Sequence, residues 1–116
     1  MQMHHKPMEL EAIVVEQILR VCFNKTRFNE LFDVIRRIVS FPRYILKKYL
    51  FYLIEIGILS YHGESQAYII TLEGLNLLYF MNTEKRKGQS DIKNIVICLE
   101  WTSKHIFVNL NCHRHL

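Results

Sequence analysis

The sequence contains few cysteines, and they form no recognisable motif. Its 116 residues include three of them, Cys22, Cys98 and Cys112, and no two stand in a CxxC arrangement. Disulfide frameworks and zinc ribbons both need paired cysteines, so neither is expected. The segment Cys112–His115 crowds potential ligands together, but structural zinc normally uses two separated pairs of ligands. We therefore expect a reducing, cytoplasmic environment, with no metal site and no cofactor.

Long apolar runs are also missing. No uninterrupted apolar run approaches the roughly eighteen residues of a membrane span, so we expect no membrane partner. Charged and polar residues interrupt the first apolar segment, 8–23, and no small-residue cleavage site follows it, so a signal peptide is not expected. Half of the residues are hydrophobic, which suits a single domain with its own core and a short extension.

The whole chain has a net charge of +4, and acidic residues are absent from its middle. No Asp or Glu lies between Val34 and Ile54, a segment that holds the cations Arg36, Arg37, Arg43, Lys47 and Lys48. A solvated helix face usually mixes charges of both signs, because oppositely charged neighbours stabilise the helix. Positive charge gathered at a helix entrance is expected where the helix N-terminus approaches phosphates. The charge pattern therefore favours a nucleic-acid partner over a basic, solvated surface without one.

The segment Ser40–Gly57 predicts the helix around which the chain is organised. Ser40 can cap its N-terminus, Pro42 suits its first turn, and Gly57 can take the left-handed conformation that ends a helix. One face is apolar, bordered by Tyr49, and consists of Leu46, Leu50, Leu53 and Ile54. The other face is basic and aromatic, with Arg43 at the helix entrance, and carries Tyr44, Lys47, Lys48 and Phe51. The first face is expected to hold the fold together, and the second is free to meet an acidic partner.

Two helices are expected before this segment. The first spans Met8–Phe23, with Cys22 in its apolar row as a small buried hydrophobe. The second runs from about Arg27 to Ile38, is capped by Thr26, and has the apolar set Phe28, Leu31, Phe32, Ile35 and Ile38. Only Val39–Phe41 then separates it from the central helix, and helices joined by so short a turn form a helix-turn-helix unit.

The periodicity changes after Gly57. Ile58–His62 and Ala67–Thr71 are rich in strand formers and flank the loop Gly63–Gln66, which predicts a β-hairpin. Thr71 can cap a further helix, from Leu72 to about Asn82, whose expected buried row is Leu75, Leu78 and Tyr79, with Gly74 where a side chain would obstruct packing. This order of elements is that of a winged helix-turn-helix domain. We therefore expect a mostly helical α+β fold over residues 7–82, with a three-helix core, a two-stranded wing and a following helix.

Two stretches resemble archaeal winged helix-turn-helix regulators. Residues 45–59, ILKKYLFYLIEIGIL, resemble the LLKKYLxYLIExGLL stretch of that family, and residues 68–75, YIITLEGL, resemble the YxITxKG segment that closes its wing. The resemblance covers roughly Met8 to Asn82. It implies binding to double-stranded DNA, usually as a homodimer, with the third helix in the major groove.

The resemblance also implies which residues face DNA. Carried over by position, the third helix presents Ser40, Arg43, Tyr44, Lys47 and Lys48, and the loop at Gly63 becomes the wing. This wing departs from the family because its tip holds Glu64 and no Lys or Arg. Only His62 and Gln66 are then left in the wing to contact a phosphate or a groove edge.

The C-terminal part allows two readings. Residues 83–91 include the basic segment Lys85–Ser90 and are expected to be a linker. In residues 92–116, apolar positions such as Ile92, Ile95 and Leu99 fit a helix, whereas the β-branched and aromatic residues around Thr102–Lys104 fit a hairpin. Related regulators pair their subunits through a C-terminal helix, so the resemblance favours a dimerising helix here.

The function predicted from these features is sequence-dependent DNA binding in transcriptional control, and not catalysis. Arg43 and Lys47 can donate to the O6 and N7 atoms of guanine, and Tyr44 and Ser40 can reach a base or a phosphate. Lys48, Arg36 and Arg37 are expected to neutralise phosphates. The alternative is a winged-helix domain that serves as a protein–protein interaction module, with the aromatic row Tyr44, Phe51 and Tyr52 as its surface.

Overall fold

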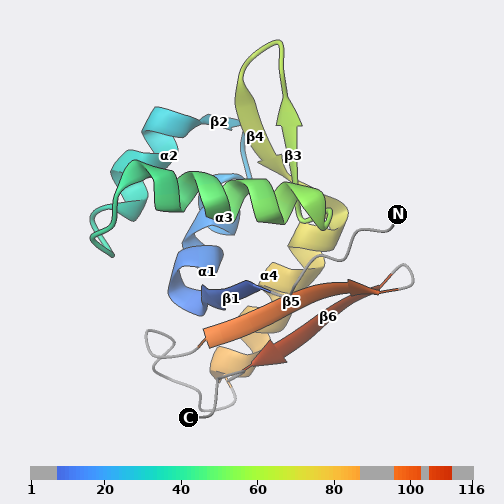
Figure 1. Ribbon diagram of the computed structural model, residues 1–116. Coiled ribbons are helices and arrows are strands. Elements are labelled where there is room, and N and C mark those ends of the chain that lie inside the picture. The colour runs from blue at the N-terminus through green and yellow to red at the C-terminus, as the bar shows by residue number, and fades with distance from the viewer. Residues whose placement is uncertain (1–7, 87–95, 103–104, 111–116) are drawn as a thin grey trace.

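The computed structural model describes residues 8–86, 96–102 and 105–110. The elements in chain order are β1 Met8–Glu11, α1 Ala12–Val21, β2 Thr26–Arg27, α2 Phe28–Ile35, α3 Arg43–Glu55, β3 Leu59–His62, β4 Ala67–Ile70, α4 Leu72–Arg86, β5 Val96–Thr102 and β6 His105–Leu110. The strands form two antiparallel sheets, with the orders β2-β4-β3 and β1-β5-β6. The β3–β4 hairpin projects at one end of the molecule, and β5 and β6 lie at the other end, with α1 and α3 between (Figure 1). The α+β class expected from the sequence is confirmed.

The first helix is shorter than predicted, because Met8–Glu11 form the strand β1 and α1 begins only at Ala12. Exposed Glu9 and Glu11 flank the fully buried Leu10, which is the alternation of a half-buried strand. The backbone of β1 pairs with β5, so Met8–Glu11 has its hydrogen-bond partners outside α1. The prediction of a helix from Met8 is therefore wrong over its first four residues.

Two predicted N-caps are also wrong. Thr26 lies in β2, which pairs with β4, and its buried hydroxyl donates to the backbone carbonyls of Val21 and Asn24 at 3.0 and 2.8 Å. The second helix starts one residue later than Arg27, whose backbone N–H donates to Glu30 Oε1 at 3.3 Å. Ser40 is exposed and precedes the helix, since Pro42 is the N-cap residue of α3. The connection between α2 and α3 is therefore longer than the predicted turn and spans residues 36–42.

The end of α3 forms as the sequence predicts. Gly57 has a φ of +85°, and its N–H donates to the carbonyl of Ile54 at 3.0 Å. The next N–H, of Ile58, donates to the carbonyl of Leu53 at 2.8 Å. These two bonds satisfy carbonyls of the last helical turn. The left-handed conformation at position 57 favours glycine, which has no Cβ.

The buried face of α3 is wider than its predicted apolar row. Its buried side chains are Leu46, Tyr49, Leu50, Tyr52 and Leu53. Tyr52 is only 8% exposed, so it is wrong to place it in an exposed aromatic row with Tyr44 and Phe51. The hydroxyl of Tyr49 accepts a hydrogen bond from the backbone N–H of Glu11 at 3.0 Å, which ties α3 to the end of β1.

The predicted hairpin and the cap of the following helix are confirmed. β3 and β4 pair on either side of Gly63–Gln66, and the hydroxyl of Thr71 accepts a hydrogen bond from the Gly74 N–H at 3.0 Å. The buried row of α4 is different from the prediction, because it contains Gly74, Leu77 and Met81 while Leu75 and Tyr79 are exposed. A Cβ on Gly74 would overlap the Ile58 carbonyl oxygen and lie 2.6 Å from Ile70 Cγ1. This close approach fixes the rotation of α4 and moves its apolar row by one position.

The C-terminal segment forms a hairpin. β5 pairs with β6 on one side and with β1 on the other, so the predicted dimerising helix is wrong. The hairpin alternative agrees with the β-branched and aromatic composition of both strands, for which β1 supplies a third partner. α4 continues to Arg86, four residues into the predicted linker. The division of the chain into residues 7–82, 83–91 and 92–116 stays a prediction.

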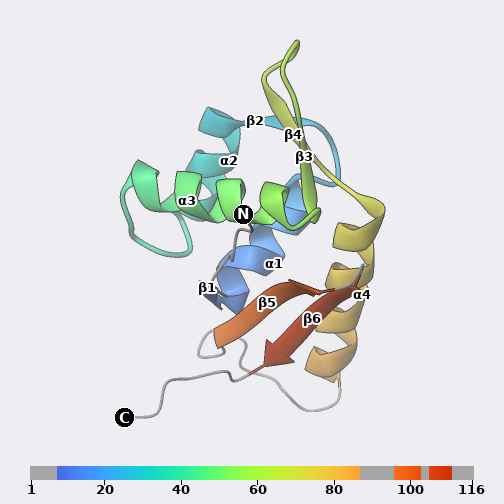
Figure 2. The same ribbon diagram turned by 45° about the vertical axis from the view of Figure 1, so that its right-hand side comes forward.

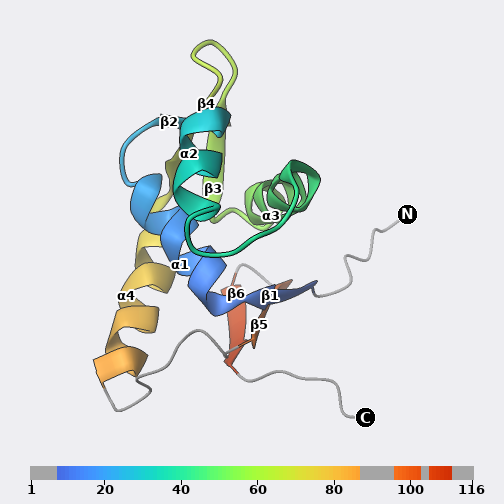
Figure 3. The same cartoon turned by 90° about the vertical axis from the view of Figure 1, so that its left-hand side faces the viewer.

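The packing leaves one long side of α3 on the outside of the molecule. Figure 2 shows the hairpin above and β5 and β6 below the helical layer, and Figure 3 places α3 on the side opposite α4. α1 lies between them and is joined to α4 by Arg20, which donates to Glu16 Oε2 at 2.8 Å and to Asn82 Oδ1 at 2.9 Å. No helix in the described ranges combines the length and apolarity needed to cross a membrane.

Candidate nucleic-acid interface

The outer face of α3 carries the side chains that the helical spacing placed there. Tyr44 and Phe51 are 62% and 64% exposed, and Lys47 and Lys48 lie exposed between them. The Lys48 ammonium lies 6.0 Å from the centre of the Tyr44 ring, within the range of a cation–π contact. The predicted exposure of this basic and aromatic face is therefore confirmed.

Arg43 is held against α2 at the entrance of α3. Its guanidinium carbon lies 4.8 Å from the centre of the Phe32 ring and 5.5 Å from that of Phe28. The two rings are stacked, with centroids 6.0 Å apart and planes 8° from parallel. One guanidinium nitrogen, Nη1, donates to Asn29 Oδ1 at 2.9 Å. Because a guanidinium has five N–H donors, Arg43 keeps further donors for a ligand while its orientation is fixed.

Arg36 and Arg37 follow α2 in the connection to α3. The guanidinium of Arg36 lies 5.9 Å from the centre of the Phe32 ring, so the same ring contacts both Arg36 and Arg43. Arg36 also lies 3.7 Å from Asp33, but both side chains are largely exposed and such a pair contributes little stability. Arg37 is exposed as well. Arg36 therefore joins the group that Arg43 forms with Phe28, Phe32 and Asn29, which we call the Arg43 cluster. Arg37 follows Arg36 in the chain.

The remaining predicted site residues lie outside α3. Ser40 is exposed before α3, and His62 is exposed at the end of β3. No side-chain hydrogen bond or ion pair links Ser40, Arg37 or His62 to the cluster within the described residues. Gln66 ends the hairpin loop with a φ of +55° and faces a cavity between the hairpin and the helices.

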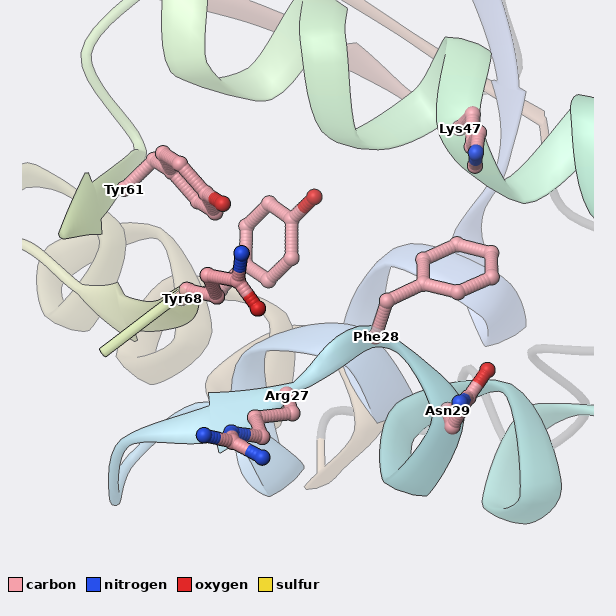
Figure 4. A pocket seen from close by; sticks show the side chains of 7 residues that line it. Arg27, Phe28, Asn29, Lys47, Tyr61 and Tyr68 are labelled. Carbon is pink, nitrogen blue, oxygen red and sulfur yellow. The ribbon is translucent and has the colours of Figure 1, made fainter. Parts of the chain in front are cut away.

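This cavity has a volume of about 320 Å³, is open to solvent on one side, and is lined by residues of β2, α2, α3 and the β3–β4 hairpin. Its lining residues are Arg27, Phe28, Asn29, Lys47, Tyr61, Gln66 and Tyr68. Figure 4 shows Tyr61 and Tyr68 on one side and Phe28 on the other, with Lys47 reaching in from α3 and Arg27 and Asn29 opposite it. The Lys47 ammonium lies 5.2 Å from the centre of the Phe28 ring. The cavity therefore combines aromatic walls with two cations.

The two tyrosines of the cavity are cross-strand neighbours. Tyr61 pairs with Tyr68 in the register of β3 and β4, and their ring centres are 4.9 Å apart. Burial raises the pKa of Tyr68, and the neighbouring Tyr61 raises it further. The Tyr68 hydroxyl therefore keeps its proton and is able to donate a hydrogen bond. A predicted hairpin with the loop Gly63–Gln66 already pairs these two positions, so the sequence contained a signal for them.

Arg27 supplies a positive charge where the hairpin loop has none. Its Nε donates to the Ser65 carbonyl at 3.2 Å, next to the acidic Glu64 at the loop tip. Sequence reasoning missed Arg27 and Asn29, because the β2–β4 pairing that brings them to the hairpin involves only two residues and has no readable periodicity. Phe28 and Phe32 were seen only as core residues, although their rings also support the cations of α3.

The outer face of α3 is positively charged. Within the described ranges, none of Arg43, Lys47 and Lys48 forms an ion pair with a carboxylate. The same part of the chain has no cluster of three His, Cys, Asp or Glu side chains able to hold a metal ion. The Cys112–His115 segment lies outside the described residues. The arrangement is suited to binding an anion through side-chain donors.

Comparison with known proteins does not assign this surface. Searches of protein-family models, of curated proteins and of solved structures each returned no match to the chain.

Proposed function

We propose that this chain is a winged helix-turn-helix protein that binds double-stranded DNA in a sequence-dependent manner and regulates transcription. In this proposal α2 and α3 are the helix-turn-helix, the β3–β4 hairpin is the wing, and α3 enters the major groove. The order and exposure of these elements support the assignment, since α3 has a free outer face and the hairpin projects beside it (Figure 1). The width of the major groove admits one α-helix.

One observation carries the proposal. Three cations, Arg43, Lys47 and Lys48, lie in the first half of α3, and no carboxylate in the described part of the chain neutralises them. The N-terminus of a helix also carries a partial positive charge, which adds to that of the side chains. Phosphates of DNA are the ligand that satisfies such a surface most fully, because each neutralised phosphate releases a condensed counterion.

The geometry suggests a division of roles. In this proposal Arg43 and Lys47 read guanine edges, and Tyr44 contacts a base or the sugar–phosphate backbone. Ser40, Lys48, Arg36 and Arg37 contact phosphates. At the wing, Arg27 joins His62 and Gln66 and supplies the cation that the loop itself lacks.

A homodimer is part of the proposal, but its interface is not the C-terminal helix that the resemblance implied, because that segment is a hairpin. Among the described strands β6 is an edge of the β1-β5-β6 sheet, and we propose that its outer backbone groups pair with those of a second copy. A symmetric dimer would bind two half-sites about 34–36 Å apart. Sedimentation equilibrium of the full chain tests this part, since a mass of one chain at all concentrations would remove the dimer.

The experiment that tests the function is a salt titration of DNA binding by fluorescence anisotropy. Two duplexes of equal length are compared, one of random sequence and one from the region upstream of the protein's own coding sequence. We expect affinity to fall steeply with salt for both, by orders of magnitude between roughly 50 and 200 mM, and to be higher for the upstream duplex. Steep dependence without preference would point to a non-specific DNA binder or to an operator elsewhere.

A protein-binding module remains the second candidate, because Phe51 is exposed in the middle of α3. It lines a shallow groove of about 540 Å³ with Lys47, Lys48, Tyr52 and Glu55. The buried position of Tyr52 reduces the aromatic surface available to such a partner. Failure to bind either duplex at low salt would favour this candidate, because an apolar interface has no steep salt dependence.

A further inference from the structure

The cavity between the hairpin and the helices is large enough to admit a small ligand. Its volume of about 320 Å³ lies at the lower end of the range of small-molecule pockets, roughly 300–1,000 Å³, so it suits one ring-sized unit and not an oligomer. It opens beside Lys47, which belongs to the proposed DNA-binding face of α3. A DNA strand bound to that face would therefore pass its entrance.

The walls of the cavity have the chemistry that binds a nucleobase. Tyr61 and Tyr68 lie on one side and Phe28 on the other, so that a flat ring entering between them meets aromatic side chains on both sides (Figure 4). Aromatic side chains bind bases in this way without regard to sequence, because every base has a π-face. Tyr61 is 45% exposed, which leaves its ring accessible to a ligand.

The polar groups of the cavity are mostly hydrogen-bond donors. Lys47 contributes an ammonium with no carboxylate partner in the described part of the chain, and Arg27 uses only its Nε in the bond to Ser65. Asn29 accepts from Arg43 through Oδ1, so its amide N–H₂ is not used in that bond. The hydroxyls of Tyr61 and Tyr68 have no hydrogen-bond partner among the described residues. These donors match phosphate oxygens and the acceptor atoms on a base edge.

We propose that this cavity receives one unpaired nucleotide of the bound DNA, with its base against the aromatic walls and its phosphate at Lys47. The inference rests on the proposed function and adds a substrate class to it, namely duplexes that contain an unpaired segment. Extracting a base from an intact duplex costs free energy, and this cost is lowest for a mismatched base. Mismatched DNA should consequently bind more tightly than a fully paired duplex of the same length.

The test compares two duplexes of equal length that differ only at four central positions of one strand. One is fully paired, and the other carries four consecutive A·A mismatches at its centre, so both present the same number of phosphates. Anisotropy titrations of the full chain at one salt concentration then give the ratio of the two dissociation constants, in which the shared electrostatic contribution cancels. We expect the mismatched duplex to bind about tenfold more tightly, as stacking of one base on aromatic rings would give.

Variants separate stacking from the greater flexibility of mismatched DNA, which also raises affinity for proteins that bend their site. Tyr61→Leu keeps an apolar side chain but removes the ring, and it should reduce the ratio to about two or less. Tyr79→Leu, at a 74% exposed tyrosine on α4, is the matched control and should keep the full ratio. Circular dichroism of each variant verifies that it is folded.

The outcomes distinguish this inference from the proposed function. Salt-dependent binding to the paired duplex with a ratio near one would overturn the inference alone. A high ratio that survives in Tyr61→Leu would also overturn it, because flexibility would then explain the preference. Tight binding to the mismatched duplex without binding to the paired duplex would support the cavity and overturn the proposed duplex regulator. Absence of binding to both duplexes would overturn both proposals.

Discussion

The guanidinium of Arg43 lies 4.8 Å from the centre of the Phe32 ring and joins the first turn of α3 to α2. A cation over an aromatic face contributes roughly 0.5–1 kcal/mol at an exposed site. The hydrogen bond to Asn29 at 2.9 Å adds direction to the contact. Arg43 is therefore presented in a fixed orientation by α2, which is the property that a base-reading arginine needs, because discrimination depends on geometry.

Replacing Arg43 by alanine tests this role. If Arg43 contacts a guanine, Arg43→Ala should relax the preference at one base position and cost about 1–3 kcal/mol of binding free energy at that site. Selection from a randomised DNA library, followed by sequencing, measures the preference position by position. Arg37→Ala is a suitable comparison, since an exposed arginine that contacts a phosphate should lower affinity for all sequences alike. A uniform loss in the Arg43 variant would count against base reading.

Gly74→Ala should destabilise the fold. The added Cβ would overlap the backbone carbonyl of Ile58 and crowd Ile70, and overpacking of this kind typically costs about 1–3 kcal/mol. Because the clash involves backbone, we take the upper part of this range, about 2–3 kcal/mol. Alanine gains roughly 1 kcal/mol of helix propensity over glycine, so we expect a net loss of about 1–2 kcal/mol in the free energy of unfolding. Urea denaturation measures it. Gly63→Ala is the control, because nothing lies within 4 Å of a Cβ at Gly63, and equal stabilities of the two variants would contradict the packing argument.

Tyr49→Phe should remove one hydrogen bond without changing the packing of the ring. The Tyr49 hydroxyl accepts from the Glu11 N–H at 3.0 Å, and this partly buried donor would lose its partner. We expect a loss of about 1 kcal/mol in the free energy of unfolding, measured in urea. Tyr44→Phe, at the exposed end of α3, should change stability by less than about 0.5 kcal/mol. A Tyr49 variant as stable as the wild type would show that the bond between β1 and α3 contributes nothing.

The thiol of Cys22 should be inert in the folded protein. Burial raises its pKa to about 12, and the reactive form of a cysteine is the thiolate. In a Cys98→Ser/Cys112→Ser variant, an aromatic disulfide reagent at about pH 8 should label Cys22 only after unfolding in urea. The unfolded thiol loses its proton near pH 9.0 and the folded thiol near 12, so the stability contributed by this group falls as pH rises between these values. Rapid labelling of the folded variant would show that the thiol is accessible.

The sequence predicted the elements with strong local signals. The glycine that ends α3, the threonine that caps α4 and the hairpin between them all depend on neighbouring residues, and all three are present. The outer face of α3 was also identified correctly, because helical spacing alone determines which of its side chains point away from the core.

The errors occur where tertiary contacts overrule local preference. Met8–Glu11 is a strand because β5 pairs with it from the far end of the sequence. Thr26 leaves its expected cap position because β2 pairs with β4, and the row of α4 shifts because Gly74 lies against Ile58. In the C-terminal segment periodicity did not separate helix from hairpin, and resemblance favoured the wrong one. At the candidate site, the same β2–β4 pairing brings Arg27 to the hairpin, which no local pattern indicates.

The most direct test of the central claim, that the outer face of α3 contacts DNA phosphates, is the salt dependence of binding for Lys48→Ala. Loss of one phosphate contact should reduce the slope of log K against log salt by about one unit. Lys25→Ala removes the same charge from the connection between α1 and β2, which lies on the side opposite α3 (Figure 3), and should leave the slope unchanged. A reduced slope for Lys48→Ala alone is the result we predict. A slope equal to that of the wild type in Lys48→Ala, or an equal reduction in both variants, would contradict the placement of DNA on α3.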